Sequence, residues 1–504
     1  MYKKLIAFIL SFALVITPLT TTVSAEYSIY KPDTTYKDNT YIKGHDTAII
    51  WVPGYRCTNL ETYKDVDDDG DKEKLVSFAV GSKVFRVSDD RPGILNFFSG
   101  FANLLISGYM LLTSQLQRED MDISPDGGFG LANIYEDFFK KCIDLYGDTC
   151  DVIIYDFDWR KPLDVPANDL YKVIRSQKYK KVIMVTQSMG GLIASGASKL
   201  LWEDNRDNDK TNDVEIYTVN VGSTVLGSFL YYLNKQSFKG IRKITPSYIK
   251  YRNELCFPSR AQLAAPTQIE TLYGRKYATA KIEKANGAVV YEDITSDVAF
   301  TDLKKICDNG DYLQKMQDYY DDYIFIDHDN NPETDVVHIM ENLGSNCYYI
   351  AGLASGSYTH VQINYEEDEN GRRTPVDCEQ ITTDDATLGD GSLLIESSTM
   401  NMCTPGTTFY VPYAHQEVYF HDDSQHLMYD MLTHIVNNPD KKFDYKDTDY
   451  QYSEVYTSPK QYKEAESDNL LFPQVVKFVL GELGISITFD EARNFCHKLF
   501  SLFK

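Results

Sequence analysis

Positive charge is scarce in this sequence. Its 504 residues include 50 Lys and Arg against 74 Asp and Glu, which gives a formal net charge of −24 at pH 7. An acidic chain repels phosphate backbones, so nucleic acid is excluded as an expected partner. The same charge disfavours electrostatic docking on anionic lipid, and any contact with a membrane would have to be apolar.

Cysteine is also scarce, with nine residues and no CxxC pair of the kind that binds zinc. The nearest approach to a metal motif is Asp65–Asp71 (DVDDDGD), which begins like a calcium loop. Val76 stands at the twelfth position, where that loop has a bidentate Glu, and we favour a polar hairpin tip instead. The sequence thus predicts no cofactor and no metal site elsewhere, and it leaves open whether Asp65–Asp71 binds calcium.

The N-terminal segment has the pattern of a secretory signal. Lys3 and Lys4 precede an apolar run over residues 5–16, and Val23-Ser24-Ala25 provides the small residues of a cleavage site. We expect residues 1–25 to be removed and the protein to be secreted. The run is too short to span a bilayer comfortably, which argues against an uncleaved anchor. Outside the cell cysteines tend to pair, and their odd count leaves at least one unpaired or bonded to another chain.

Short apolar runs alternate with stretches of helical spacing through most of the chain. The helical spacing is found over 134–146 and 169–179, and the runs are typical of buried parallel strands. Such alternation predicts an α/β fold with a doubly wound, mostly parallel sheet over residues 26–438. Sites in these sheets lie at the carboxyl ends of the strands. The predicted strands are 47–52, 152–155, 181–185, 215–221 and 348–352.

Two insertions interrupt this alternation, near 62–125 and over 235–341, and we expect them to form lids or caps. Within the first, Pro92–Gln117 contains no charged residue. It is interpreted as a buried helical hairpin, a lipid-facing segment or, least in keeping with the strands on both sides, a transmembrane span. The second insertion is polar, rich in Tyr and without clear periodicity, and we expect it to cap the sheet.

Residues 439–504 differ in composition from the rest. Asp440–Asn469 is rich in Tyr, Asp and Lys, which predicts a linker or a solvated loop. Two amphipathic helices are expected after it, one from Pro473 and one over Phe489–Phe503. They either pack on the main domain or form a hairpin that anchors the chain or binds a partner.

A candidate nucleophile stands at the end of one predicted strand. Residues 181–194 read KVIMVTQSMGGLIA, in which an apolar strand turns sharply into a helix around Ser188. This is the pattern of a nucleophile elbow, which lifts the serine hydroxyl above the sheet at a helix N-terminus. Thr186 replaces the first Gly of the G-x-S-x-G motif, and its β-branched side chain makes that position more crowded.

A serine nucleophile needs a histidine base and an orienting acid, in the chain order Ser, Asp, His for this fold class. Asp390 is the leading acid, because it stands in a glycine-flanked loop before an apolar run. We expect the base to be His426, in a loop between a strand-like run at 417–420 and a helix, with His421 as its competitor. The histidines after Ser188 in the stretch up to this helix are His328, His338, His360, His415, His421 and His426.

Two backbone amides are candidates for an oxyanion hole. Met189 follows the nucleophile directly, and Tyr55 follows the Pro-Gly turn at the end of the first predicted strand. Because these are main-chain groups, side-chain substitutions would test them poorly.

Seven motifs carry a family resemblance. Taken in this order, they resemble the signature of the lecithin:cholesterol acyltransferase family, which includes lysosomal phospholipases and plant phospholipid:diacylglycerol acyltransferases. The resemblance covers roughly residues 45–437. The motifs are IIWVPGYRCTNLE (49–61), YDFDWRKPLD (155–164), VTQSMGG (185–191), NVGSTVLGS (220–228), CFPSR (256–260), LGDGS (388–392) and SQHLMYDMLTHI (424–435).

The resemblance implies an α/β-hydrolase fold and a set of site residues. By position, it places a triad on Ser188, Asp390 and His426 and the oxyanion amides on Tyr55 and Met189. It also implies lipid-facing elements near the first strand and in a cap after the nucleophile helix. The chain departs from the family at Thr186, in the uncharged segment 92–117 and in the C-terminal extension.

These observations favour a secreted serine acyl hydrolase or acyltransferase. Its substrate would be a lipid ester at a membrane or lipid-aggregate surface, processed through an acyl-enzyme without a cofactor. One alternative is a non-catalytic lipid- or surface-binding protein on the same scaffold. Another is a carboxylesterase on soluble or polysaccharide esters. Head group, acyl chain, hydrolysis against transfer, disulfide pairing and oligomeric state stay open.

Overall fold

The computed structural model of the protein describes 14 parts of the chain and divides it into two compact units. The larger unit comprises residues 43–55 and 146–467, and the smaller one residues 1–42, 56–145 and 468–504. The described residues are 40–55, 57, 60–64, 73–78, 121–123, 134–207, 213–232, 258–307, 310–327, 336–402, 404, 406–415, 417–437 and 441–465.

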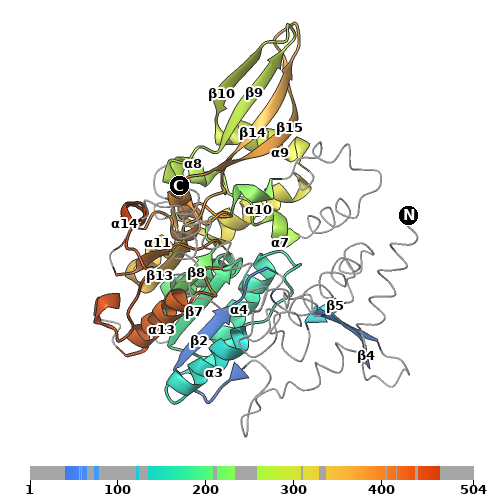
Figure 1. Cartoon of the computed structure of the whole chain (residues 1–504). Helices are drawn as coiled ribbons and strands as arrows, with labels where there is room; N and C mark the ends of the chain where they lie inside the picture. The colour runs from blue at the N-terminus through green and yellow to red at the C-terminus, as the bar shows by residue number, and fades with distance from the viewer. Residues whose placement is uncertain are drawn as a thin grey trace, which may run out of the picture. The chain divides into compact units, whose positions relative to one another are not determined.

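A parallel sheet forms the centre of the larger unit (Figure 1). Six strands of this unit lie side by side in the order β6-β2-β7-β8-β13-β16, and every neighbouring pair is parallel. Their near-continuous apolar runs are buried, as strands covered on both faces require. The strands are β6 (Asp151–Ile154), β2 (Thr47–Val52), β7 (Lys181–Ser188), β8 (Glu215–Ser223), β13 (Cys347–Gly352) and β16 (Thr408–Val411).

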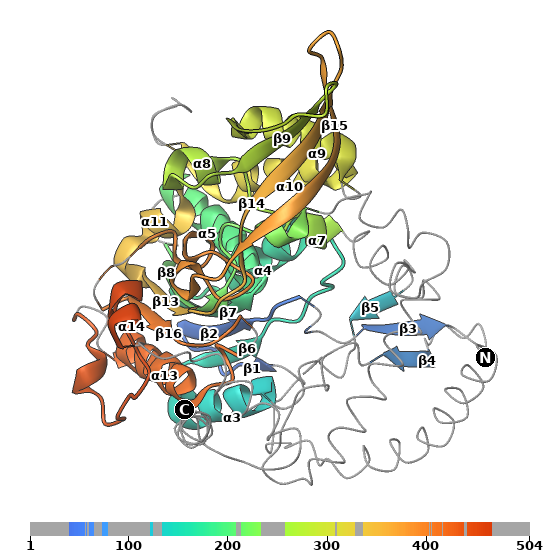
Figure 2. The same cartoon turned by 45° about the horizontal axis from the view of Figure 1, so that its top comes forward.

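The mixed α/β prediction with a mostly parallel sheet is confirmed. Five of the six strands coincide with the predicted runs, and β16 is the strand that the sequence did not reveal. Helix α5 (Gly190–Asp207) packs on β7 and β8, helix α13 (Asp422–Asn437) packs on β8, and helix α4 (Asp164–Gln177) lies beside α5. Figure 2 shows α4 and α5 on one side of the strands and α13 on the other.

Small residues let α5 approach its neighbours closely. A Cβ added to Gly196 would lie 2.6 Å from the Tyr319 hydroxyl oxygen and 2.9 Å from the Ala167 Cβ. The Tyr319 hydroxyl also donates to the Leu192 carbonyl oxygen at 2.9 Å. The helix that follows the candidate nucleophile is therefore held closely against α4 and against α10 (Gly310–Tyr323).

The larger unit contains a second sheet, which lies above the central one in the view of Figure 1. It is ordered β10-β9-β14-β15, with β9 and β14 parallel and the other pairs antiparallel. Helix α9 packs on β9 and β15. The elements are β9 (Ala278–Lys284), β10 (Val289–Ile294), β14 (Ser357–Glu367), β15 (Arg373–Thr383) and α9 (Ser296–Ile306).

The insertion over 235–341 contains regular secondary structure in its described part, although its sequence shows little periodicity. That part contains β9, β10 and a set of helices and short strands, and its sheet is completed by β14 and β15 from beyond residue 341. The remaining elements are α7 (Pro258–Ala261), α8 (Gln268–Tyr273), α10 (Gly310–Tyr323), β11 (Phe325–Asp327), β12 (Val336–His338) and α11 (Ile339–Leu343).

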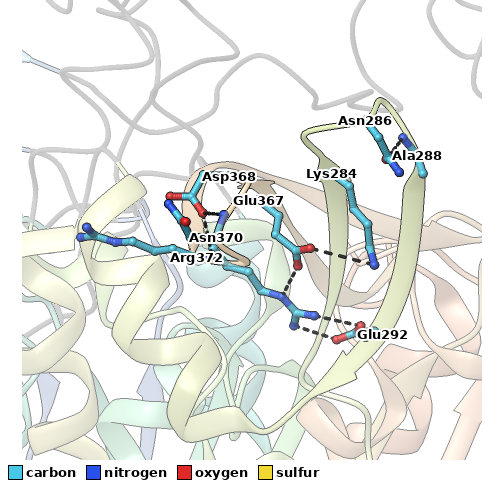
Figure 3. A network of polar contacts seen from close by, with 9 residues as sticks. Lys284, Asn286, Ala288, Glu292, Glu367, Asp368, Asn370 and Arg372 are labelled. Atoms are coloured by element: carbon cyan, nitrogen blue, oxygen red, sulfur yellow. Dashed lines mark hydrogen bonds and ion pairs between the residues drawn. The ribbon is translucent and has the colours of Figure 1, made fainter.

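Charged side chains link the strands of this second sheet near its hairpin ends. Arg373 of β15 pairs with Glu367 (3.1 Å) and with Glu292 (2.8 Å) of β10, while Lys284 of β9 lies 3.9 Å from Glu367 (Figure 3). Asp368 accepts hydrogen bonds from the amides of the turn between β14 and β15. Exposed pairs of this kind contribute little stability each, so the sheet depends mainly on its buried face.

The segment expected to be a linker packs instead on the larger unit. Tyr456 forms an antiparallel bridge with Tyr410 of β16, and Asp423 of α13 accepts from the amides of Ser453 (3.0 Å) and Glu454 (2.7 Å). The compact unit accordingly extends to Ser467, beyond the predicted boundary at 438. Helix α12 (Ile395–Thr399) and helix α14 (Pro459–Ala465) complete this unit together with short 3₁₀ turns.

The smaller unit contains a three-stranded antiparallel sheet in the order β4-β3-β5. Strands β3 and β4 pair with Lys64 opposite Glu73, on either side of Asp65–Asp71, as a hairpin requires. Its elements are β1 (Thr40–Tyr41), β3 (Leu60–Lys64), β4 (Glu73–Phe78), β5 (Met121–Ile123) and α3 (Ile134–Tyr146), whose last residue belongs to the larger unit.

Several predictions concern residues outside the described ranges. They are the signal segment 1–25, the run Asp65–Asp71 itself, Pro92–Gln117, and the helices from Pro473 and over Phe489–Phe503. Among the helices that are described, we find none long and apolar enough to span a membrane.

Candidate active site

Ser188 occupies a strained turn between β7 and α5. It is the last residue of β7, its φ is 48°, and α5 begins two residues later at Gly190. L-residues with a side chain rarely adopt positive φ, and such strain is found where a surrounding structure enforces it. The turn therefore has the backbone geometry expected of a nucleophile elbow.

Two glycines make this turn possible. A Cβ on Gly190 would lie 2.1 Å from the Val52 carbonyl oxygen, and one on Gly191 would lie 2.6 Å from the Thr224 carbonyl oxygen. Both distances are far below contact distance and involve main-chain atoms, so no larger residue fits without moving the loops after β2 and β8. The elbow is thus seated directly on these two loops.

Thr186 is accommodated by β8 rather than crowding the turn. Its side chain is fully buried, its Oγ1 donates to Asn220 Oδ1 at 2.8 Å, and it lies 2.6 Å from Ser223 Oγ. The Ser223 hydroxyl also contacts the Thr186 carbonyl oxygen at 2.8 Å. The residue that departs from the G-x-S-x-G pattern thus ties β7 to β8 just before the nucleophile.

Replacing Thr186 with valine should lower the free energy of unfolding by about 1–3 kcal/mol, because buried hydrogen-bonding groups on Asn220 and Ser223 lose a partner. Thr186→Ser is the matched control, since it keeps the hydroxyl and removes only the methyl group. Denaturant unfolding of the two variants and the wild type measures the difference. A valine variant as stable as the serine variant would contradict the role given to this hydroxyl.

Asp390 lies in a buried turn that engages one of its carboxylate oxygens and leaves the other for His415. The side chain is 1% exposed, and its Oδ1 accepts from the amides of Ser392 (3.0 Å) and Leu393 (2.7 Å). Gly391 supports the turn with a φ of 86°, in the region that favours glycine. The other oxygen, Oδ2, lies 2.8 Å from His415 Nδ1.

His415 joins the serine to the aspartate. It follows β16, with its Nδ1 on Asp390 and its Nε2 3.0 Å from Ser188 Oγ. Its backbone amide donates to the Asp390 carbonyl oxygen at 2.8 Å, which fixes the two loops to each other. Burial lowers the pKa of His415, but the charge of Asp390 and its hydrogen bond outweigh this, and the pKa is raised above its ordinary value.

The prediction of His426 as the base is wrong. His426 lies within α13, four residues after the helix begins, and its ring stacks on Tyr450 with 3.8 Å between ring centroids. The competitor His421 is also occupied elsewhere, stacked on Tyr413 at 3.7 Å. The structure brings Ser188 and Asp390 together as predicted, but with His415 as the third residue.

The loop that carries His415 is braced by the segment after α13. The Tyr413 hydroxyl, two residues before His415, donates to the buried carboxylate of Glu454. Glu454 is itself held through its amide by Asp423, and the Tyr450 hydroxyl donates to the other oxygen of Asp423 at 2.9 Å. The segment that leads into the histidine is therefore held by the chain after α13.

The two candidate oxyanion amides belong to loops that touch. Met189 is buried in the turn itself, and Gly190 beside it lies against the carbonyl oxygens of Val52 and Pro53. Tyr55 follows these residues, and its ring packs edge-on against Trp159 with 5.0 Å between centroids. The loop after β2 is therefore positioned next to the nucleophile turn, where a second donor would be needed.

This arrangement has the geometry for nucleophilic catalysis. An imidazole held by a buried carboxylate on Nδ1 can take the proton of a serine hydroxyl on Nε2, which generates a nucleophile at neutral pH. Ser188 ends β7, His415 lies in the loop after β16, and Asp390 is paired to the chain just beyond β13, so all three lie at the carboxyl ends of parallel strands, where sites of such sheets are found. Ala354, just beyond β13, forms a parallel bridge with Asp390.

Searches of protein-family models and of curated proteins returned no match to this chain. The resemblance to the lecithin:cholesterol acyltransferase family stays a prediction from the seven ordered motifs.

Proposed function

We propose that this protein is a secreted serine acyl hydrolase or acyltransferase that acts on lipid esters. The single observation that carries the proposal is the hydrogen-bonded series of Ser188, His415 and Asp390. His415 Nε2 lies 3.0 Å from Ser188 Oγ, and His415 Nδ1 lies 2.8 Å from Asp390 Oδ2. The strained turn at Ser188 supports it, because it exposes the hydroxyl of a residue otherwise surrounded by a packed sheet.

In the proposed reaction, Ser188 Oγ attacks the carbonyl carbon of an ester while His415 accepts its proton. Asp390 holds the Nδ1 hydrogen and stabilises the imidazolium, and the amides of Met189 and Tyr55 bind the oxyanion. His415 then protonates the leaving alcohol, which departs from the acyl-enzyme. Water releases the acyl chain as a fatty acid, whereas an acceptor alcohol receives it as a new ester.

The lipid nature of the substrate is supported by the sequence. The ordered motifs resemble a family whose members act on phospholipids and glycerides. The chain also has an uncharged segment over 92–117, which is long enough to form a lipid-facing element. The N-terminal signal pattern supports export. The hydrogen bonds of Thr186 with Asn220 and Ser223 weaken one argument for a scaffold without activity, namely that this residue spoils the elbow.

Fluorophosphonate labelling tests this proposal, because only an activated serine reacts with the probe. We expect the purified mature chain to be labelled at Ser188 and the folded Ser188→Ala variant to be unlabelled. Wild-type protein incubated with mixed phospholipid vesicles containing sterol should release free fatty acid, form a new ester on the sterol, or both. Absence of labelling in folded protein would overturn the proposal in favour of a binding function.

A jump in rate at the aggregation concentration of the substrate distinguishes a lipase from an esterase on soluble esters. We expect the rate to rise when a short-chain phospholipid passes from monomers to micelles. A rate that follows monomer concentration alone would assign the site to soluble esters.

A further inference from the structure

Two cysteines face each other where α9 packs on the second sheet. Cys307 Sγ and Cys378 Sγ lie 3.7 Å apart, and both residues are buried, at 0% and 1% exposure. Cys307 ends helix α9, with its amide bonded to the Leu303 carbonyl oxygen. Cys378 lies in the middle of β15, opposite Ile363 of β14. Residues far apart in the chain are thus brought into thiol contact by the packing of α9 on the edge strand.

We infer that Cys307 and Cys378 form a disulfide that fastens α9 to β15 when the protein folds in an oxidising compartment. To form this bond, the sulfur atoms need to approach from 3.7 Å to about 2.05 Å. This inference is independent of the proposed catalytic function, because it concerns a sheet that does not contribute Ser188, Asp390 or His415.

The chemistry balances as a two-electron oxidation by thiol–disulfide exchange. One cysteine, as a thiolate, attacks a disulfide oxidant such as oxidised glutathione or a protein disulfide oxidoreductase and forms a mixed disulfide. The second cysteine then displaces the oxidant's remaining thiol. The protein loses two hydrogens in total, and the oxidant leaves as two thiols.

Burial determines when this bond can form. The hydrogen bond with Cys307 and burial both raise the pKa of the Cys378 thiol, so little thiolate exists in the folded chain. An external oxidant also has poor access to two buried sulfur atoms. The bond is therefore made while α9 and β15 come together, and once made it is protected from reductants in the same way.

The cross-link would close a long loop and secure an exposed edge. The two cysteines are 71 residues apart, and the loop between them contains β13 of the central sheet and β14 of the second sheet. Closing such a loop restricts the unfolded chain and so favours the folded state. Because β15 has a neighbouring strand on one side only, its attachment to α9 adds a second restraint on this edge of the sheet.

Peptide mapping of the full-length secreted protein tests the inference without any activity measurement. The protein is denatured without reductant, its free thiols are alkylated, and it is digested and analysed by mass spectrometry. We expect one peptide pair joining Cys307 to Cys378, two hydrogens lighter than the sum of its parts and separated by reduction. Recovery of both cysteines as alkylated thiols, or linked to other cysteines, would overturn the inference.

A thermal comparison measures what the bond contributes. Reductant present during unfolding should lower the melting temperature of the wild type by about 5 °C. A Cys307→Ser/Cys378→Ser variant should already melt lower and lose less on reduction, whereas Cys347→Ser keeps the linked peptide and the full response. Equal responses of the wild type and the double variant would contradict a bond between these residues.

Discussion

His415→Ala is expected to lower kcat/KM for ester hydrolysis by about 10³- to 10⁴-fold, whereas His426→Ala should keep it within about threefold of the wild type. His415 Nε2 is 3.0 Å from Ser188 Oγ, so its removal takes away the group that accepts the serine proton. His426 is stacked on Tyr450 within α13, and its loss removes only that ring contact. A soluble chromogenic ester and the fluorophosphonate probe give two independent readouts.

His421→Ala completes this comparison as a control on the loop itself. Its ring is stacked on Tyr413, two residues before His415, so the variant reports what a disturbance of the loop costs. We expect a loss much smaller than that of His415→Ala, with melting curves showing all three variants folded. If folded His426→Ala were inactive and His415→Ala active, the assignment of the base would be reversed.

The serine and the aspartate of the site could be predicted because each has a local signal. Ser188 follows an apolar strand and precedes two glycines, and backbone contacts at both glycines explain why this pattern is required. Asp390 stands between two glycines, and its turn is closed by the amides of Ser392 and Leu393. In both cases the sequence signal lies within a few residues of the functional side chain.

The histidine has no such signal. The strand before it, Thr408–Val411, is four residues long and is recognised as a strand only by its pairing with β13. The strand expected at 417–420 is instead a pair of successive turns. Its apolar character has another cause, since Val418 packs closely on Gly222 and Gly352 at the ends of β8 and β13. The choice among histidines therefore depended on contacts that sequence patterns do not record.

The fold shows the same contrast between elements with a local sequence signal and elements that depend on distant pairing. The central strands are long buried runs of branched residues, whose identity is clear from composition alone. The second sheet is less visible, because its buried positions in β9 include Ala278 and Ala280, which indicate neither strand nor helix strongly. Its central pairing, β9 with β14, joins Ala278 to Val361 across a large separation in the chain. The sequence of this region consequently shows little periodicity, and its strands are defined by pairing with distant partners.

Asp390→Asn should lower kcat/KM by about 10⁴-fold and also shift its dependence on pH. The amide oxygen can still accept from the Ser392 and Leu393 amides, so the turn is expected to stay folded. The amide nitrogen, however, donates where Oδ2 accepted, which favours the imidazole tautomer that carries its proton on Nε2. That tautomer cannot accept the proton of Ser188.

The direction of the pH shift follows from the two opposing influences on His415. In the wild type, burial lowers its pKa, and the stronger combined effect of the Asp390 charge and hydrogen bond raises it above the ordinary value of about 6.5. A base acts only when neutral, so wild-type kcat/KM should fall as the pH decreases through this raised pKa. In Asp390→Asn the raising influence is lost and burial persists, so the residual activity should persist to lower pH. The matched control is Asp384→Asn, which removes a neighbouring carboxylate that is exposed. If kcat/KM fell at the same acidic pH in all three proteins, Asp390 would not act on the base.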